Sequence, residues 1–177
     1  MFLLDTNILS QSQKAKPLQG VSAWLRRQTK VAIPFPVLVE IEEGIADVRR
    51  TKPDKADQLA DWRDALLATE FEYPTINPNI ARSLAQMHCC RPLKNFWFRE
   101  TEAEKVKKPS QDLFIAAIAI EHRLPIATLD GRDFEYIDRF FPIPGVYNPE
   151  HDHWHVDEPL TDFDRRPLFG NEVIEVA

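Results

Sequence analysis

The feature that most constrains the fold is the short apolar run Phe2–Leu4, which is interrupted by Asp5, Thr6 and Asn7 before apolar residues resume. A short apolar run bounded by polar residues is typical of a buried strand in a parallel sheet. Asp5 would then lie at the carboxyl end of this strand, where open α/β sheets bind their ligands. Asp and Asn also cap helices and shape turns, so this stretch alone leaves a structural and a chemical role open.

Further short apolar runs alternate with helical patterns, which predicts an α/β fold with a mostly parallel sheet. We expect additional strands at residues 31–33, 71–76 (an edge strand, because of Pro74), 125–128 and 146–148. We expect helices over about residues 20–29, 36–45, 59–69, 78–90 and 112–124. The charged stretch between residues 49 and 55 reads as a connection.

Two of these helices carry an acid that needs an explanation. Glu40 lies among apolar residues that form one helix face, whereas Glu42 and Glu43 fall on the other side. A Glu among core positions is unusual unless it is paired, protonated or bound to a metal. Asp112 opens a later apolar helix, where Ser110 is a candidate N-cap and the helix dipole favours an acid, so a structural role would also explain it.

The strand that ends at Thr128 is followed by Asp130, with Asp133 just beyond. The fold would gather Asp5, Glu40, Asp112 and Asp130 at one edge of the sheet. Two unit charges about 4 Å apart repel by roughly 4 kcal/mol at an effective dielectric near 20, so protons or a divalent cation must relieve the cluster. Oxygen ligands without nearby His or Cys favour Mg²⁺ or Mn²⁺ over zinc, and these ions promote phosphodiester hydrolysis.

Composition separates a neutral body from an acidic end. Residues 149–177 hold eight of the chain's 28 acids but only two of its 22 bases, so residues 1–148 carry 20 of each. We therefore expect a domain over 1–148 and an irregular acidic extension over 149–177, and the neutral body leaves a nucleic-acid ligand open. We see no membrane-spanning run and no secretory signal, and the adjacent Cys89 and Cys90 form no metal or redox motif, which favours the cytoplasm.

The blocks LLDTN, VEIEEG, DLFIAAIAIEHRLPIATLDGRDFE and PGVYNP occur in this order over residues 1–148. In this the chain resembles the PIN-domain family, and within it the VapC/FitB-type toxins of bacterial toxin–antitoxin pairs. The resemblance implies a PIN-like α/β fold and a Mg²⁺- or Mn²⁺-dependent ribonuclease that is a homodimer and is inhibited by a VapB-like antitoxin. The family's acidic positions match these residues: Asp5, Glu40, Asp112, Asp130 and the further acid Asp133. Its polar positions around the site match Thr6, Asn7 and Thr128.

The sequence departs from the family pattern in four places. Pro34 and Pro36 stand where Ser or Thr is frequent, and Leu129 replaces a frequent Arg that would contact phosphate. The segment 91–108 is longer than the usual connection, and the extension from residue 149 is normally absent. Because that segment mixes bases with aromatic residues, it could grip phosphates and stack on unpaired bases, or its aromatic residues could dock on the body.

Two rival functions remain open. The first is a catalytically inactive PIN-fold protein that binds or regulates a partner, although all four acids are present. The second is a phosphatase with Asp5 as the nucleophile. That chemistry expects a second Asp two residues on, where this chain has Asn7.

The extension suggests two further hypotheses. His151, His153 and His155 alternate, so an extended segment could present three imidazoles to a transition metal, although such tracts are more often solvated. The acidic extension could also cover the basic segment 91–108 and compete with RNA.

Overall fold

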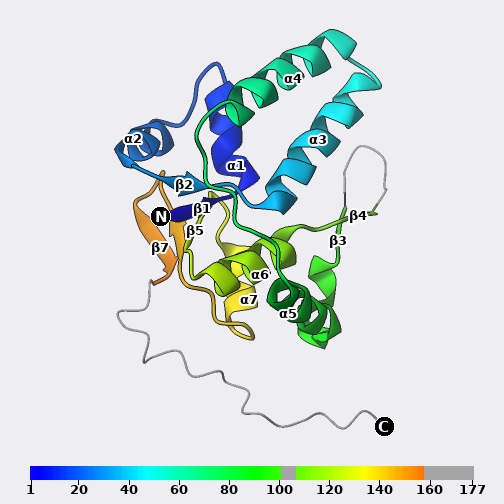
Figure 1. Cartoon of the computed structure of the whole chain (residues 1–177), viewed down its shortest axis with the longest axis vertical. Coiled ribbons are helices and arrows are strands. Elements are labelled where there is room, and N and C mark those ends of the chain that lie inside the picture. The colour runs from blue at the N-terminus through cyan, green and yellow to red at the C-terminus, as the bar shows by residue number, and fades with distance from the viewer. Residues whose placement is uncertain (101–106, 158–177) are drawn as a thin grey trace, which may run out of the picture.

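The structure is a computed structural model that describes residues 1–100 and 107–157. Its centre is a five-stranded sheet in the order β2–β1–β5–β6–β7 (Figure 1). The strands are β1 (Phe2–Leu4), β2 (Val31–Ala32), β5 (Ile126–Ala127), β6 (Val146–Asn148) and β7 (His153–Val156). Every neighbouring pair is parallel except β6–β7, which is antiparallel. This confirms the α/β architecture with a central, mostly parallel sheet.

The described helices include the five that the sequence predicted and two short ones, over residues 6–9 and 132–138, that it did not predict. They are α1 (Thr6–Leu9), α2 (Gln19–Arg27), α3 (Phe35–Arg49), α4 (Pro53–Leu67), α5 (Pro78–Cys89), α6 (Asp112–His122) and α7 (Arg132–Asp138), with 3-10 turns η1 (Ser10–Gln13) and η2 (Arg91–Phe96). The core surrounds α6, in which Leu113 and residues 115–119 are all buried. A helix that is apolar on every side is stable only when it is covered on every side, and α6 packs against α3, α5 and α7.

Three of the expected elements differ from the structure. Residues 71–76 do not form a strand. Of these residues only Glu72 pairs with the sheet, through one isolated parallel bridge to Ala32 of β2. Pro53 begins α4 instead of lying in a connection, since its missing N–H costs nothing in the first turn of a helix. The segment 91–108 contains η2 and a hairpin of β3 (Phe98–Glu100) and β4 (Lys107–Pro109).

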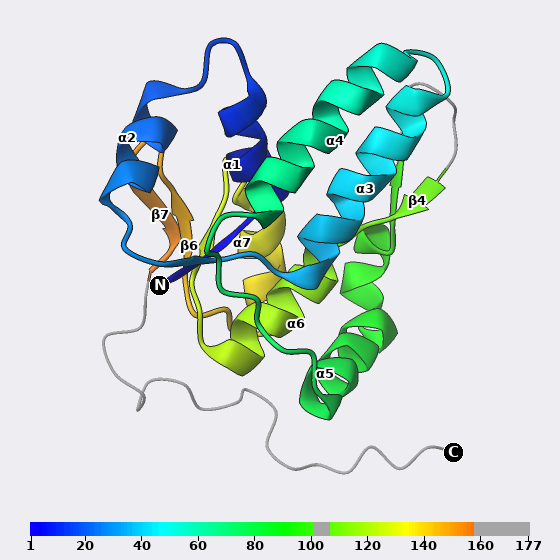
Figure 2. The same ribbon diagram turned by 45° about the horizontal axis from the view of Figure 1, so that its top comes forward.

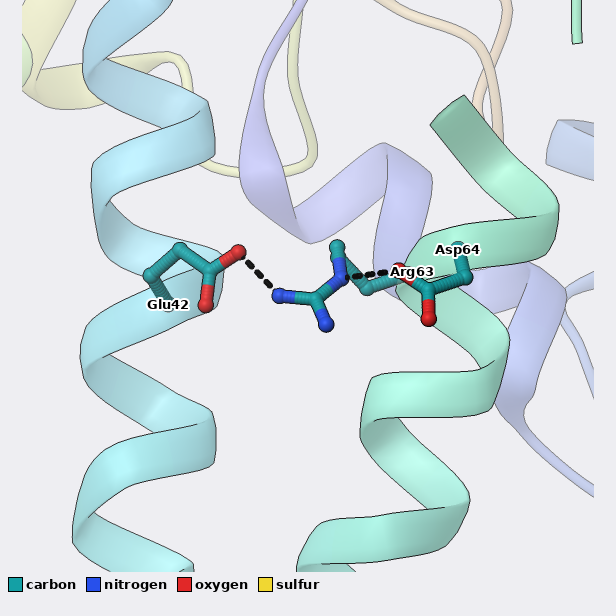
Figure 3. Close-up of polar contacts among 3 residues, drawn as sticks. All are labelled: Glu42, Arg63 and Asp64. Atoms are coloured by element: carbon teal, nitrogen blue, oxygen red, sulfur yellow. Dashed lines mark hydrogen bonds and ion pairs between the residues drawn. The ribbon is translucent and has the colours of Figure 1, made fainter. Parts of the chain in front are cut away.

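Helices α3 and α4 lie side by side as an antiparallel pair, at the opposite end of the molecule from α5 (Figures 1 and 2). Arg63 of α4 bridges them, because its guanidinium donates to Glu42 of α3 and, over 2.8 Å, to Asp64 (Figure 3). Glu42 therefore faces α4, whereas Glu40 points toward Thr6. In the described residues, no helix combines the length and apolarity that a membrane crossing needs.

The extension begins as part of the sheet. After β6 the chain turns and returns as β7, so residues 153–156 form an edge strand that the sequence did not predict. Trp154 packs against Tyr147 and Phe2, with ring centroids 4.9 and 5.8 Å away, and Trp24 completes this aromatic cluster. Residues 158–177 lie outside the described residues. The hypothesis that the acidic extension covers segment 91–108 concerns these residues and stays a prediction.

Candidate active site

Asp5 lies between β1 and α1 and performs the structural role that the sequence left open. One carboxylate oxygen caps α1 by accepting from the backbone N–H of Thr6 over 2.6 Å. The other accepts from the Asn7 amide over 2.8 Å and from the Thr128 hydroxyl over 2.7 Å. A cap needs only one oxygen, so the hydrogen bonds to the second oxygen hold the carboxylate in a way that capping alone does not require.

The electrostatic environment of Asp5 is not that of an ordinary cap. Its side chain is buried, and its pKa is raised from 3.8 to about 7, with desolvation as the largest cause. The negative charges of Asp112 and then Glu40 contribute to this rise, whereas the hydrogen bonds from Thr128 and Thr6 oppose it. Two of the other acids proposed as metal ligands, Glu40 of α3 and Asp112 of α6, therefore lie within electrostatic reach of Asp5.

Glu40 is held by a side chain from the same loop as Asp5. The Thr6 hydroxyl donates a short hydrogen bond to the Glu40 carboxylate, across 34 positions of sequence. Because Asp5 accepts from the backbone N–H of Thr6, this one residue links the two carboxylates.

Asp112 is the first residue of α6 and is buried. Ser110 is not the N-cap, because Gln111 occupies that position. The Ser110 hydroxyl instead donates to the Asp112 carboxylate over 2.6 Å and accepts from its backbone N–H over 3.3 Å. Ser110 thus orients the Asp112 carboxylate. The sequence analysis missed this role, because a Ser two residues before an Asp is a common pattern that does not indicate it.

A polar network joins β1 to the loop after β5. The Asn7 amide nitrogen donates to the Thr128 hydroxyl over 2.9 Å, and its carbonyl oxygen accepts from the Leu129 N–H over 3.0 Å. The Asp130 N–H donates to the same Thr128 hydroxyl over 3.1 Å. Asn7 thus acts as a donor toward Asp5, which a second ionised Asp could not do, and this argues against the phosphatase reading.

Asp130 and Asp133 have a different status from the other acids. Both side chains are exposed, and the causes that raise the pKa of Asp5 do not include either of them. Asp130 is connected to the site through its backbone, and Asp133 lies in the first turn of α7. Their roles as a metal ligand and an assisting acid remain predictions.

The donor chemistry of this site fits a hard divalent cation. The side chains around Asp5 offer carboxylate, hydroxyl and amide oxygen atoms, which are the ligands that hard divalent cations prefer. Among the residues described, no three His, Cys, Asp or Glu side chains already stand close enough together to hold an ion.

The described part of segment 91–108 is anchored to the body and then projects from it. Phe96 stacks on Tyr136 of α7 with centroids 5.8 Å apart, and Leu93 is buried, so docking explains these residues. Trp97 remains exposed. The hairpin β3–β4 follows and returns the chain to Ser110, whose N–H donates to the carbonyl of Trp97 over 3.4 Å.

The three tail histidines do not form one row. His151 lies in the turn before β7, whereas His153 and His155 lie in β7 with ring centroids 5.0 Å apart. This turn is not a continuation of the extended strand, so alternation in sequence does not put all three imidazoles on one side.

A family model described as PIN domain matches residues 2–139. The comparison with curated proteins found no match. The crystal structure of FitAcB from Neisseria gonorrhoeae is similar, with 26% identity and a TM-score of 0.61 over 85% of this chain and 99% of its own.

Two further structures share the fold at lower identity. A toxin–antitoxin complex from Klebsiella pneumoniae has 23% identity and a TM-score of 0.53, covering 84% of this chain and 98% of its own. VapBC2 from Rickettsia felis, bound to a promoter DNA fragment, has 20% identity and a TM-score of 0.54, covering 76% and 90%.

Proposed function

Because this chain belongs to the PIN domain family, we propose that it is a divalent-metal-dependent ribonuclease and the toxin of a toxin–antitoxin pair. The observation that carries the proposal is the Asp5 carboxylate, buried, with its pKa raised to about 7 beside Asp112 and Glu40. The negative charges of Asp112 and Glu40 both raise the pKa of Asp5, so they repel its ionised carboxylate. Bound Mg²⁺ or Mn²⁺ would relieve that repulsion.

The chain's own residues have distinct roles in this proposal. Carboxylates of the four matched acids would hold the cation: Asp5, Glu40, Asp112 and Asp130. Asp133 would assist from the first turn of α7. When bound, the cation supplies an activated water and stabilises the attacking and leaving oxygens of a phosphodiester.

The polar residues around Asp5 prepare its carboxylate for this role. Thr6, Asn7 and Thr128 all donate to the carboxylate oxygens of Asp5 and so fix their orientation before a ligand arrives. Because a carboxyl group must lose its proton to bind a metal, affinity for the cation should rise steeply up to about the pKa of Asp5.

Segment 91–108 supports an RNA substrate. Its sequence holds six bases together with Phe96, Trp97 and Phe98, a mixture that can grip phosphates and stack on unpaired bases. Arg91 and Lys94 are exposed in η2, and the ring of Trp97 that follows them is exposed as well. We therefore assign this segment to the sugar–phosphate backbone and bases of a single RNA strand.

The proposed partner is a VapB-like antitoxin on a separate chain. Similar structures include toxin–antitoxin complexes, which supports this assignment. We also propose that the toxin is a homodimer and acts in the cytoplasm, where its RNA substrate is found.

A metal-binding assay combined with a cleavage assay tests the function. Mn²⁺ should raise the melting temperature of the wild-type protein, because a ligand of the native state stabilises it by mass action. Asp5→Asn should abolish both this increase and the cleavage of RNA. Asp61→Asn, which changes an exposed acid on α4, is the matched control and should retain both. RNA cleavage that persists in purified Asp5→Asn protein would eliminate the proposal.

The alternative is a PIN-fold protein that binds RNA or a regulatory partner without cleaving it. Leu129 supports this alternative, because the family's frequent Arg at this position would contact phosphate and Leu cannot. The prolines at 34 and 36, both buried at the start of α3, also change the approach to Glu40. Wild-type protein that binds Mn²⁺ and RNA but releases no product would favour this alternative.

A further inference from the structure

The extension beyond residue 148 contacts the loop that carries Asp130. Asn148 begins the turn into β7, and its side-chain carbonyl accepts from the Glu150 N–H over 3.0 Å. Tyr147 donates a short hydrogen bond to Asp152, which has a left-handed backbone with φ of 49°. These bonds fix the turn and therefore fix the register in which β7 returns along β6.

Alternation along β7 sends consecutive side chains to opposite faces of the sheet. Trp154 joins the aromatic cluster, so its neighbour His155 points to the other face. There the imidazole of His155 lies against the backbone of Gly131. A Cβ placed on Gly131 would be 2.1 Å from Cδ2 and 2.4 Å from Cγ of His155, which leaves no space for any side chain.

The reason for glycine at position 131 is therefore the imidazole ring. Gly131 has φ of −80° and ψ of −9°, a backbone conformation that any residue adopts. Nδ1 of His155 is also 3.9 Å from the carboxylate of Glu135, one turn further along α7. The ring thus contacts α7 at its N-cap and on its first full turn.

Gly131 separates the two acids that remain least defined in the proposed site, Asp130 and Asp133. The backbone just before it is held on two sides. The Leu129 N–H donates to Asn7, and its carbonyl accepts from the Asn148 amide over 3.1 Å. His155 supplies a third constraint, after Asp130.

We infer that His155 is a positioning residue, which fixes the backbone between Asp130 and Asp133 by filling the space where a side chain of residue 131 would be. The strand β7 is then a part of the catalytic domain that supports one end of its acid cluster. This inference rests on the proposed function, because it concerns the acids assigned there to the cation.

The test measures backbone order and metal affinity separately from cleavage. In the full chain without metal, His155→Ala should speed amide hydrogen exchange at residues 130–133 relative to the wild type. His155→Phe keeps a ring against Gly131 and should restore slow exchange. His151→Ala, in the exposed turn, is the matched control and should exchange like the wild type. Mn²⁺ affinity of His155→Ala should fall on the order of tenfold, as for other residues that support metal ligands.

A double-mutant cycle gives a second test, whose readout is the melting temperature. Gly131→Ala should lower the melting temperature when His155 is present and be tolerated in the His155→Ala background, since the clash is then gone. Equal exchange in His155→Ala and the wild type, or a cost of Gly131→Ala that is the same in both backgrounds, would overturn the inference. A wild-type protein that cleaves no RNA would instead refute the proposed function, while the exchange comparison would still decide the role of His155.

Discussion

Replacing Asp5 with Asn should change how the stability of the metal-free protein depends on pH. The buried carboxyl group has a folded-state pKa of about 7 against 3.8 when unperturbed. Between these two values the folded protein keeps a proton that the unfolded chain has released. Stability therefore falls as pH rises through this window, and the favourable contribution is complete only below the unfolded pKa.

The size of the effect follows from the same two values. Each tenfold change in the acid constant is worth about 1.4 kcal/mol, so the whole difference is roughly 4 kcal/mol. The variant carries no titrating group at this position. The difference between the unfolding free energies of the variant and the wild type should therefore shift by about 4 kcal/mol in favour of the variant from pH 4 to pH 8. Differences in hydrogen bonding between a carboxyl group and an amide add an offset that does not depend on pH.

Urea unfolding in the presence of a chelator measures this gap directly. The fluorescence of Trp24 and Trp154 reports the transition, because both rings pack in the aromatic cluster around Phe2. Asp61→Asn is the control and should stay parallel to the wild type at every pH. If the Asp5→Asn and wild-type curves are also parallel from pH 4 to pH 8, the reasoning about the buried carboxyl group is wrong. Saturating Mn²⁺ at pH 8 should stabilise the wild type by about 3 kcal/mol at a hundred times Kd and leave the variant unchanged.

Three further variants test separate contacts. Thr128→Val removes the hydroxyl that donates to Asp5, so the pKa of Asp5 should rise and Mn²⁺ binding, measured by calorimetry, should require a higher pH. Trp154→Ala removes the ring that anchors β7 and should cost roughly 3 kcal/mol, or about 9 °C in the melting temperature followed by circular dichroism. Arg91→Gln combined with Lys94→Gln, two exposed bases of η2, should reduce the slope of log affinity against log salt by about 1.4 for a single-stranded oligonucleotide in the Asp5→Asn background, as loss of two phosphate contacts implies. An unchanged slope would remove these two bases from the substrate site.

Local patterns in the sequence were sufficient for the order of the central strands β1, β2, β5 and β6 and of the longer helices, and they indicated the candidate residues of the site. A strand that ends at an acid, such as β1 before Asp5, is visible because apolar runs and polar stops are properties of neighbouring residues. The same holds for the cap at Asn77, whose side chain accepts from the backbone of Asn79 and Ile80. The prediction of a strand at residues 71–76 was wrong. An extended segment becomes a strand only where a neighbouring strand pairs with it, and here only Glu72 pairs, with Ala32.

The sequence by itself determined a mostly parallel α/β sheet and singled out the acids that we propose for its carboxyl edge, since hydrophobic period and turn chemistry are encoded locally. Only the tertiary structure decided that Asp5 is buried beside Asp112 and Glu40, and that its pKa rises to about 7, because desolvation depends on everything packed around a group. Only the tertiary structure, too, placed His155 on Gly131, 24 residues earlier in the chain. That contact arises from the return of β7 along β6, and no spacing within either segment encodes it.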